Sequence, residues 1–212
     1  MPLHQILWEA NQDLAEACWK QPFVQDLGEG TLNPAAFRCY VAQDAYFLRA
    51  FLRAYALGAA KSDTLEQARC FQHFMGGVLE ELELHGRYAA SLGIDLNQVR
   101  PLTATSAYTD FLLRTAWGGD LGEIVAAMAP CMRLYAWLGQ RLLPSLRDDH
   151  PYRDWIVTYA SADFAALAQE VETLLNAVGH DKPVVRDAYR YAMVCERQFF
   201  AAPLAATRTG AG

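Results

Sequence analysis

Two carboxyl groups of this sequence stand at positions where a helical repeat places apolar side chains. Residues 40, 44, 47 and 51 recur along one face of a predicted helix, and on it Asp44 lies among aromatic residues. Residues 185, 189, 192, 196 and 199 form a similar face near the C-terminus, with Glu196 as its charged member. A carboxyl whose pKa is raised by apolar surroundings is suited to proton transfer near neutral pH.

A thiol occupies the third face of this kind. Cys131 lies one helical turn from Tyr135 and directly follows Pro130, inside a segment with a helical pattern. A proline within a helix removes one hydrogen bond and kinks the axis, so we expect space for a ligand beside the thiol. A thiolate there could act as a nucleophile.

Each of these residues also has a structural interpretation. Arg38 could pair with Asp44 and Arg197 with Glu196, since a buried carboxylate needs a partner. Cys131 could be an inert packing residue, because free cysteine behaves as a small hydrophobe. We interpret the remaining cysteines as packing residues (Cys18, Cys39, Cys70 and Cys195).

Apolar residues recur mostly at three- and four-residue steps, and the sequence therefore predicts an all-α fold, a compact helical bundle. Asn33 and Pro34 mark one helix start, and Asp63 with Glu66 resembles a capping box at another. The predicted helices cover 3–20, 34–61, 63–92, 106–117, 121–143, 152–159, 163–178 and 183–200. We expect a single helical domain over 1–202 and a flexible C-terminal tail over 203–212.

Composition narrows the classes of partner and compartment. The 212 residues carry a net charge of −6, and the basic residues are scattered, which argues against nucleic-acid binding. No apolar run approaches the roughly 20 residues of a membrane span, and the first residues lack the features of a signal peptide. Five cysteines without paired spacing indicate a reducing compartment, so we expect a cytoplasmic protein without membrane contact.

The sequence gives little sign of a metal site. Glu81 and His85 stand four residues apart and could supply two ligands, but a di-iron bundle needs histidines on facing helices and the last predicted helix has none. We therefore expect no metal and no other cofactor. We interpret Glu80, Glu81 and Glu83 as a solvated face or a subunit contact, with His85 paired to Glu81.

Five segments, in order along nearly the whole chain, resemble the TenA family, also called thiaminase II. They are F-x-x-Y-x-x-Q-D-x-Y at 37–46, A-T-S-A-Y-T at 104–109, P-C-x-x-x-Y at 130–135, Y-x-x-W-I-x-x-Y at 152–159 and E-x-x-F at 196–199. The resemblance implies a fold similar to haem oxygenase but without haem. Cys131 places the chain with the cysteine-containing branch of that family.

The resemblance also implies an activity, with a small-molecule pyrimidine as the partner. Members of the family hydrolyse 4-amino-5-aminomethyl-2-methylpyrimidine to the hydroxymethyl compound and ammonia in thiamine salvage, and they cleave thiamine less efficiently. Cys131 would be the nucleophile that adds to C6 of the ring, Glu196 the acid and base, and Asp44 the group that binds the aminopyrimidine.

The remaining site residues implied by the resemblance are aromatic. Tyr108 and Tyr135 would orient the thiol and the substrate, while Tyr159 and Phe47 would line the pocket. Phe47 stands where the family often has a tyrosine, so one polar contact to the substrate would be missing.

Other functions remain open at this stage. One alternative is a non-catalytic regulator of TenA type, and another is an enzyme of the same fold that acts on a different small amine or as a di-iron oxidase. The resemblance implies a homotetramer, and apolar outer faces on several predicted helices would fit a homo-oligomer.

Overall fold

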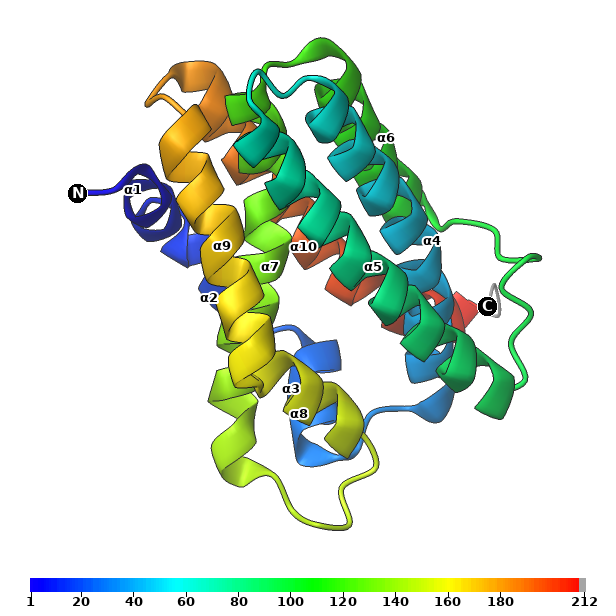
Figure 1. Ribbon diagram of the computed structural model, residues 1–212. Coiled ribbons are helices and arrows are strands. Elements are labelled where there is room, and N and C mark those ends of the chain that lie inside the picture. The colour runs from blue at the N-terminus through cyan, green and yellow to red at the C-terminus, as the bar shows by residue number, and fades with distance from the viewer. Residues whose placement is uncertain (210–212) are drawn as a thin grey trace.

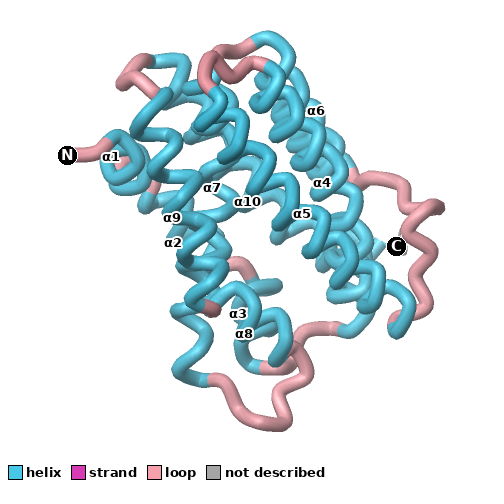
Figure 2. Tube along the Cα trace, viewed as in Figure 1, coloured by secondary structure: helices cyan, strands magenta, loops and turns pink. Residues whose placement is uncertain are grey.

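The protein is a bundle of helices in the computed structural model, which describes residues 1–209 apart from the side chains of Leu84, Ser91 and Thr209 (Figure 1). Figure 2 shows helices joined by loops, with no strand among these residues. The helices are α1 (Leu3–Glu9), α2 (Gln12–Trp19), α3 (Pro22–Glu29), α4 (Pro34–Ala60), α5 (Leu65–Ser91), α6 (Thr103–Gly118), α7 (Leu121–Leu142), a 3-10 turn η1 (Leu143–Ser145), α8 (Arg153–Ala160), α9 (Ala162–Val178) and α10 (Pro183–Thr209). The predicted all-α class is confirmed.

Local sequence signals set the starts of the two longest central helices. The Asn33 side chain accepts a hydrogen bond from the Ala35 N–H at 2.9 Å, and Pro34 occupies the first turn of α4, as predicted. The start of α5 differs from the prediction. Thr64, rather than Asp63, caps this helix, because Thr64 and Gln67 exchange the two hydrogen bonds of a capping box.

The ends of the chain depart further from the sequence prediction. The helix expected over 3–20 is broken into α1 and α2 beside Asn11, and α3, which was not predicted, begins with Pro22 in its first turn. Helix α10 continues past Phe200 and through Pro203 to Thr209, so most of the expected tail is helical, while 210–212 lie outside the described residues. The flexibility of 203–212 stays a prediction.

Two groups of helices face each other across the core. Helix α4 packs along α5 and α6, while α7 packs along α8, α9 and α10. Helix α10 also contacts α4 and α6, and it runs behind and between the two groups in Figure 1. No helix of the described part of the chain has both the length and the apolar character needed to cross a membrane.

Gly139 sets the approach of α8 to α7. A Cβ at this position would lie 2.4 Å from the Tyr159 carbonyl carbon, so only glycine allows this contact. The close contact brings Tyr159 beside Tyr135 of α7, with ring centroids 4.8 Å apart. Both tyrosines are thereby held in the core between the two helix groups.

The three faces that carry the unexpected polar groups point into this core. Asp44 is 4% exposed and Glu196 is 1% exposed, and the apolar residues of their faces are buried with them. Cys131 differs, because it is only half-buried although its neighbours on α7, Pro130 and Met132, are buried. Helix α7 is continuous through Pro130.

Candidate active site

The first group of the site is a carboxyl that two other helices supply with donors. Glu196 of α10 accepts a hydrogen bond from the Tyr108 hydroxyl of α6, with 2.7 Å between Oη and Oε1. The thiol of Cys131 on α7 lies near this carboxyl, and each group shifts the pKa of the other. Burial raises the pKa of Glu196 to about 8 against the opposing effect of the Tyr108 hydroxyl and the Cys131 thiol, with a further rise from the charge of Asp44. Glu196 is therefore mostly protonated at neutral pH.

The thiol itself is neutral in the resting protein. Burial, followed by the negative charges of Glu196, Asp44 and Glu81, raises the pKa of Cys131 well above its ordinary range. A thiolate would form only as its proton leaves for an acceptor. The neighbouring carboxyl of Glu196 provides that acceptor when it is ionised.

The second group is an ion pair between α4 and α5. His85 Nε2 lies 2.7 Å from Asp44 Oδ2, and its Nδ1 lies 3.0 Å from the main-chain oxygen of Glu81. A carbonyl oxygen and a carboxylate oxygen only accept, so both ring nitrogens donate and His85 is an imidazolium cation. Burial lowers the pKa of His85, but the hydrogen bond and charge of Asp44, with the charge of Glu81, outweigh it and raise the pKa to about 9. This ion pair corrects two interpretations made from the sequence. The partner of Asp44 is His85 and not Arg38. The His85 ring bonds to the main-chain oxygen of Glu81 rather than to its side chain.

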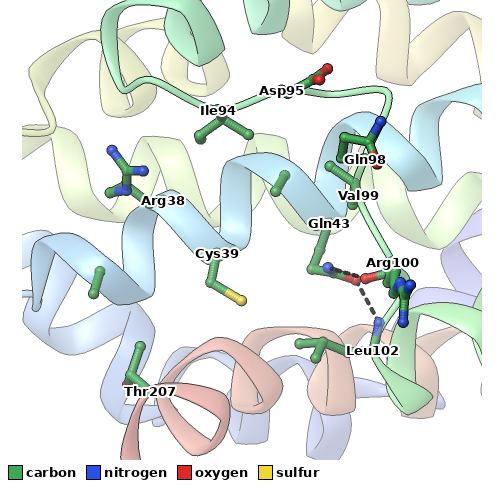
Figure 3. Close-up of a pocket in the computed structure, with 12 residues that line it drawn as sticks. Arg38, Cys39, Gln43, Ile94, Asp95, Gln98, Val99, Arg100, Leu102 and Thr207 are labelled. Atoms are coloured by element: carbon green, nitrogen blue, oxygen red, sulfur yellow. Dashed lines mark hydrogen bonds between the residues drawn. The ribbon is translucent and has the colours of Figure 1, made fainter. Parts of the chain in front are cut away.

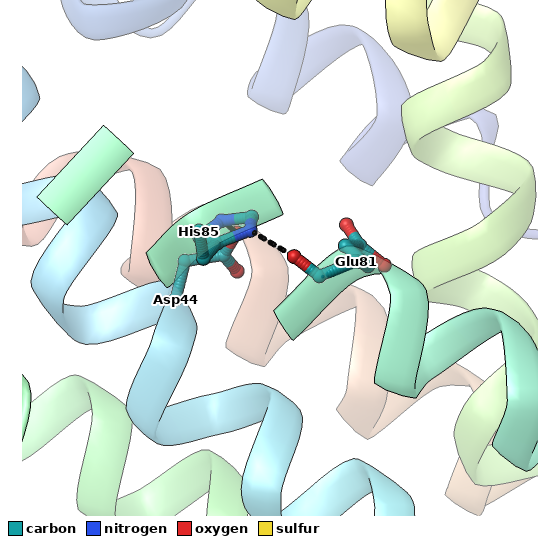
Figure 4. Close-up of side chains that lie close together, drawn as sticks. All are labelled: Asp44, Glu81 and His85. Atoms are coloured by element: carbon teal, nitrogen blue, oxygen red, sulfur yellow. Dashed lines mark hydrogen bonds and ion pairs between the residues drawn. The ribbon is translucent and has the colours of Figure 1, made fainter. Parts of the chain in front are cut away.

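Glu81 belongs to the same cluster and not to a solvated face (Figure 4). Its Oε1 accepts a hydrogen bond from the Tyr159 hydroxyl of α8 at 2.8 Å, and the residue is half-buried, whereas Glu80 and Glu83 are exposed as expected. Burial and the charge of Asp44 raise the pKa of Glu81 to about 7, against the opposing effects of His85 and Tyr159. Glu81 therefore exchanges its proton near neutral pH.

Aromatic side chains enclose these polar groups. The Tyr40 hydroxyl donates to the Tyr135 hydroxyl at 3.2 Å and accepts from the Trp155 indole at 3.2 Å, which fixes three rings from three helices. On the other side Phe47 packs on Tyr108, with ring centroids 4.7 Å apart. Flat apolar walls of this kind suit a planar aromatic ligand.

The residues predicted for the site converge in the folded chain. The pKa of Tyr135 is raised first by burial and then by the neighbouring Tyr40. The charges of Asp44, Glu196 and Cys131 raise it further. Tyr108 and Tyr159 are bonded to the two acids described above, and Phe47 lies on Tyr108. The expected pairing of Glu196 with Arg197 is replaced by its hydrogen bond from Tyr108.

Sequence reasoning missed four residues of this region, namely Glu81, His85, Tyr40 and Trp155. The signal for the first two was present. Phe74, Val78 and Ala89 are buried on α5 at helical spacing with His85, so Glu81 and His85 break an apolar stripe just as Asp44 does.

One group of side chains has the composition of a metal site. The candidate ligand atoms of Asp44, Glu81 and His85 all lie within 4.8 Å of one another. Both nitrogens of His85 face acceptor oxygens, however, so the ring offers no lone pair to a cation in this arrangement. The donor set therefore fits an internal ion pair better than a metal.

Cavities lie on the α4 side of the site. A cavity of about 670 Å³ opens between α4 and the loop over 94–102, and Gln43 is one of the residues that line it (Figure 3). The Gln43 side chain donates to the Arg100 carbonyl at 3.1 Å and accepts from the Leu102 N–H at 2.8 Å. A small pocket of about 20 Å³ lies next to His85, Tyr159 and Trp155. Gln43 thus anchors this loop one residue before Asp44.

The described residues form an all-α bundle, and its aromatic core holds a thiol, carboxyl groups and an imidazolium. The sequence profile of the TENA/THI-4/PQQC family matches residues 8–195, and the chain belongs to this family.

Curated relatives carry related names. The chain is 35% identical to an aminopyrimidine aminohydrolase from Halalkalibacterium halodurans over 176 residues, which cover 80% of this chain and 79% of the relative. It is 36% identical to the bifunctional TH2 protein, mitochondrial, from Arabidopsis thaliana over 212 residues and 87% of this chain. The chain spans only 34% of the length of that plant protein.

Solved structures agree with the fold. A TenA homologue from P. horikoshii matches with a TM-score of 0.89 at 26% identity, over 97% of this chain and 99% of that chain. Haem oxygenase-1 from Synechocystis matches with a TM-score of 0.67 at 15% identity, over 99% of this chain and 97% of that chain. The expected haem-oxygenase-like fold is confirmed.

Proposed function

We propose that this chain is an aminopyrimidine aminohydrolase of thiamine salvage. It converts 4-amino-5-aminomethyl-2-methylpyrimidine and water to the hydroxymethylpyrimidine and ammonia, and cleaves thiamine less efficiently. The observation that carries the proposal is the proximity of the Cys131 thiol to a buried carboxyl, Glu196, that accepts a hydrogen bond from Tyr108. The names of the curated relatives support the same activity.

The first step forms a bond between sulfur and the ring. The Cys131 thiol passes its proton to the Glu196 carboxylate as the sulfur adds to C6 of the pyrimidine. Glu196 then delivers that proton to the adjacent ring nitrogen, so the adduct is neutral overall. A carboxyl with a pKa of about 8 can both accept and return a proton near neutral pH.

The second step breaks the exocyclic carbon–nitrogen bond. Electrons of the adduct move through C5 and expel the amine as ammonia, which leaves an exocyclic methylene group. Water adds to that methylene and loses a proton, and the sulfur then leaves C6 with its electron pair while the ring nitrogen gives up its proton. The thiol is restored and no oxidant or reductant is consumed.

Asp44 binds the aminopyrimidine edge of the substrate in this proposal. The His85 ring pairs with Asp44 Oδ2, and the Asp44 carboxyl group accepts a hydrogen bond from the exocyclic 4-amino group. Tyr108 and Tyr135 orient the thiol and the ring, while Tyr159 and Phe47 line the pocket.

We further propose a cytoplasmic homo-oligomer, a tetramer by resemblance to the family. Light scattering of the purified protein tests the oligomeric state directly. A monomer at micromolar concentration would contradict this part of the proposal without affecting the proposed chemistry.

Ammonia release from the aminomethylpyrimidine tests the function. We expect turnover by the wild-type protein, and loss of roughly 100-fold or more in Cys131→Ala and Glu196→Gln. Cys70→Ala, which removes another half-buried thiol, is the matched control and keeps full activity. Wild-type protein that releases no ammonia would favour a regulator or a different amine, and iron bound in stoichiometric amount would favour the oxidase alternative.

A further inference from the structure

We propose that Glu81 is the group that binds the leaving amine and controls its proton, a role separate from that of Glu196. The inference rests on the proposed function and deepens it. It gives the enzyme two acids with divided tasks, one for the ring and one for the leaving group.

The position of Glu81 supports this role. Its carboxyl lies in one cluster with Asp44 and His85, and the Tyr159 hydroxyl fixes Oε1 at 2.8 Å. Asp44 and His85 are 4% and 5% exposed, whereas Glu81 is half-buried and keeps accessible surface. A ligand that reaches the Asp44 carboxylate also meets the Glu81 carboxyl, because the candidate ligand atoms of these residues lie within 4.8 Å of one another.

The order of substituents on the pyrimidine places the leaving group near Glu81. Asp44 is assigned to the amino group at C4 and Cys131 to the attack at C6, so the aminomethyl group at C5 projects between these two residues. The Glu81 carboxyl lies within 4.8 Å of the Asp44 carboxylate, next to the group assigned to C4, and its charge also acts on Cys131. Its carboxyl therefore lies on the side of the ring where the amine departs.

Charge favours an ammonium group at this point. The His85 cation already neutralises Asp44, and Glu81 remains as the carboxyl without a cation of its own in the cluster. The aminomethyl group and Glu81 share one proton, either as ammonium and carboxylate or as amine and acid. In both forms the carbon–nitrogen bond breaks with its electron pair on nitrogen, and ammonia leaves.

We assign Glu196 to the other end of the reaction. It accepts a hydrogen bond from Tyr108 and lies near the Cys131 thiol, so it handles the proton that passes from the thiol to the ring nitrogen. When the carbon–nitrogen bond has broken, ammonia still occupies the site, and the Glu81 carboxylate takes the proton that the attacking water loses. Glu81 then passes this proton to the ammonia, which departs as ammonium, so the proton balance closes.

Thiamine provides a substrate that does not need Glu81 for departure. Its leaving group is a thiazole, which carries no N–H and departs as a neutral molecule when the bond to the thiazolium nitrogen breaks. The two substrates share the pyrimidine, the thiol attack and the acid at the ring. They differ at the atom that Glu81 would contact.

The test compares the two substrates in Glu81→Gln. We expect kcat/KM for the aminomethylpyrimidine to fall by about 100-fold, and kcat/KM for thiamine to fall much less, so the ratio of the two changes. Glu83→Gln is the control, because Glu83 is exposed on the same helix and should leave both values unchanged. An equal fall for both substrates, or no change in the ratio, would overturn the inference.

Two further measurements keep the test decisive. If Glu81→Gln does not fold, Glu81→Asp keeps the carboxyl but shortens its reach, and the same ratio is measured in that variant. Wild-type protein inactive on the aminomethylpyrimidine would refute the proposed function, whereas an active wild type with an unchanged ratio in the variant would refute only the role of Glu81.

Discussion

The imidazole of His85 donates one hydrogen bond to the Asp44 carboxylate, at 2.7 Å, and a second to the main-chain oxygen of Glu81, at 3.0 Å. A ring that donates from both nitrogens is an imidazolium cation. The carboxyl group that we propose to bind the substrate therefore has an ion-pair partner from α5 in the folded protein.

We expect His85→Gln to change the dependence of stability on pH. The pKa of His85 rises from 6.5 in the unfolded chain to about 9 in the folded protein, so its contribution is complete below pH 6.5 and is lost as pH rises through about 9. The difference in unfolding free energy between wild type and variant should reach up to roughly 3 kcal/mol near pH 6 and shrink by pH 10. Urea unfolding across this range measures it. His73→Gln is the control, since the exposed His73 lies on the same helix, and a difference that does not vary with pH would contradict the cationic assignment.

Glu196→Gln should flatten another part of the stability profile. The pKa of Glu196 is raised from 4.5 to about 8, so the folded protein holds this proton more tightly, and stability falls as pH rises from 4.5 through about 8. Glutamine resembles the protonated acid and does not titrate, so the variant should lose less stability over this interval than wild type. Thermal unfolding at several pH values tests this. Parallel profiles for the two proteins would count against a protonated Glu196.

We expect alanine substitutions at Gly139, where α7 contacts α8, and at Gly86 of α5 to have opposite effects on stability. Gly139→Ala should destabilise the protein by about 1–3 kcal/mol, because the new Cβ meets the main chain of Tyr159. Gly86→Ala is the matched comparison within α5, where a Cβ meets nothing within 4 Å, and should stabilise by roughly 0.5–1 kcal/mol. Chemical denaturation measures both. Equal effects would mean that the close approach of α7 and α8 is not fixed by Gly139.

Phe47→Tyr introduces the hydroxyl that the family resemblance implies for this position. Phe47 is buried against Tyr108 and Phe199, so we expect the free protein to lose about 1 kcal/mol of stability from an incompletely bonded hydroxyl. We also expect a lower KM for the aminopyrimidine, because the hydroxyl can bond to the substrate. Calorimetry and steady-state kinetics measure the two effects. An unchanged KM for both amine and thiamine would show that this position does not contact the substrate.

Helical periodicity was sufficient to predict the fold class and the buried faces of Asp44, Cys131 and Glu196. It could not predict which helices face one another, and this is why Arg38 and Arg197 were the expected partners while His85, Tyr108 and Cys131 are the observed ones. A partner on the same helix is visible in sequence, but a partner on another helix depends on packing.

The missed residues on α5 have a different cause. Glu81 and His85 were interpreted through their mutual spacing and the neighbouring Glu80 and Glu83, and three nearby glutamates resemble a solvated surface. The buried stripe through Val78 and Ala89 predicts the positions of Glu81 and His85 better, because one helix can present exposed and buried acids on opposite faces.

No single helix of the described bundle contains this site. Asp44 comes from α4, His85 from α5, Tyr108 from α6, Cys131 from α7 and Glu196 from α10, so nearly the whole chain must be assembled before the Cys131 thiol meets the Glu196 carboxyl. A chain divided between α9 and α10 would separate these two groups, and under the proposed function we expect neither fragment to be active alone. Activity regained on mixing the two fragments would then report that the last helix has docked on the rest of the bundle.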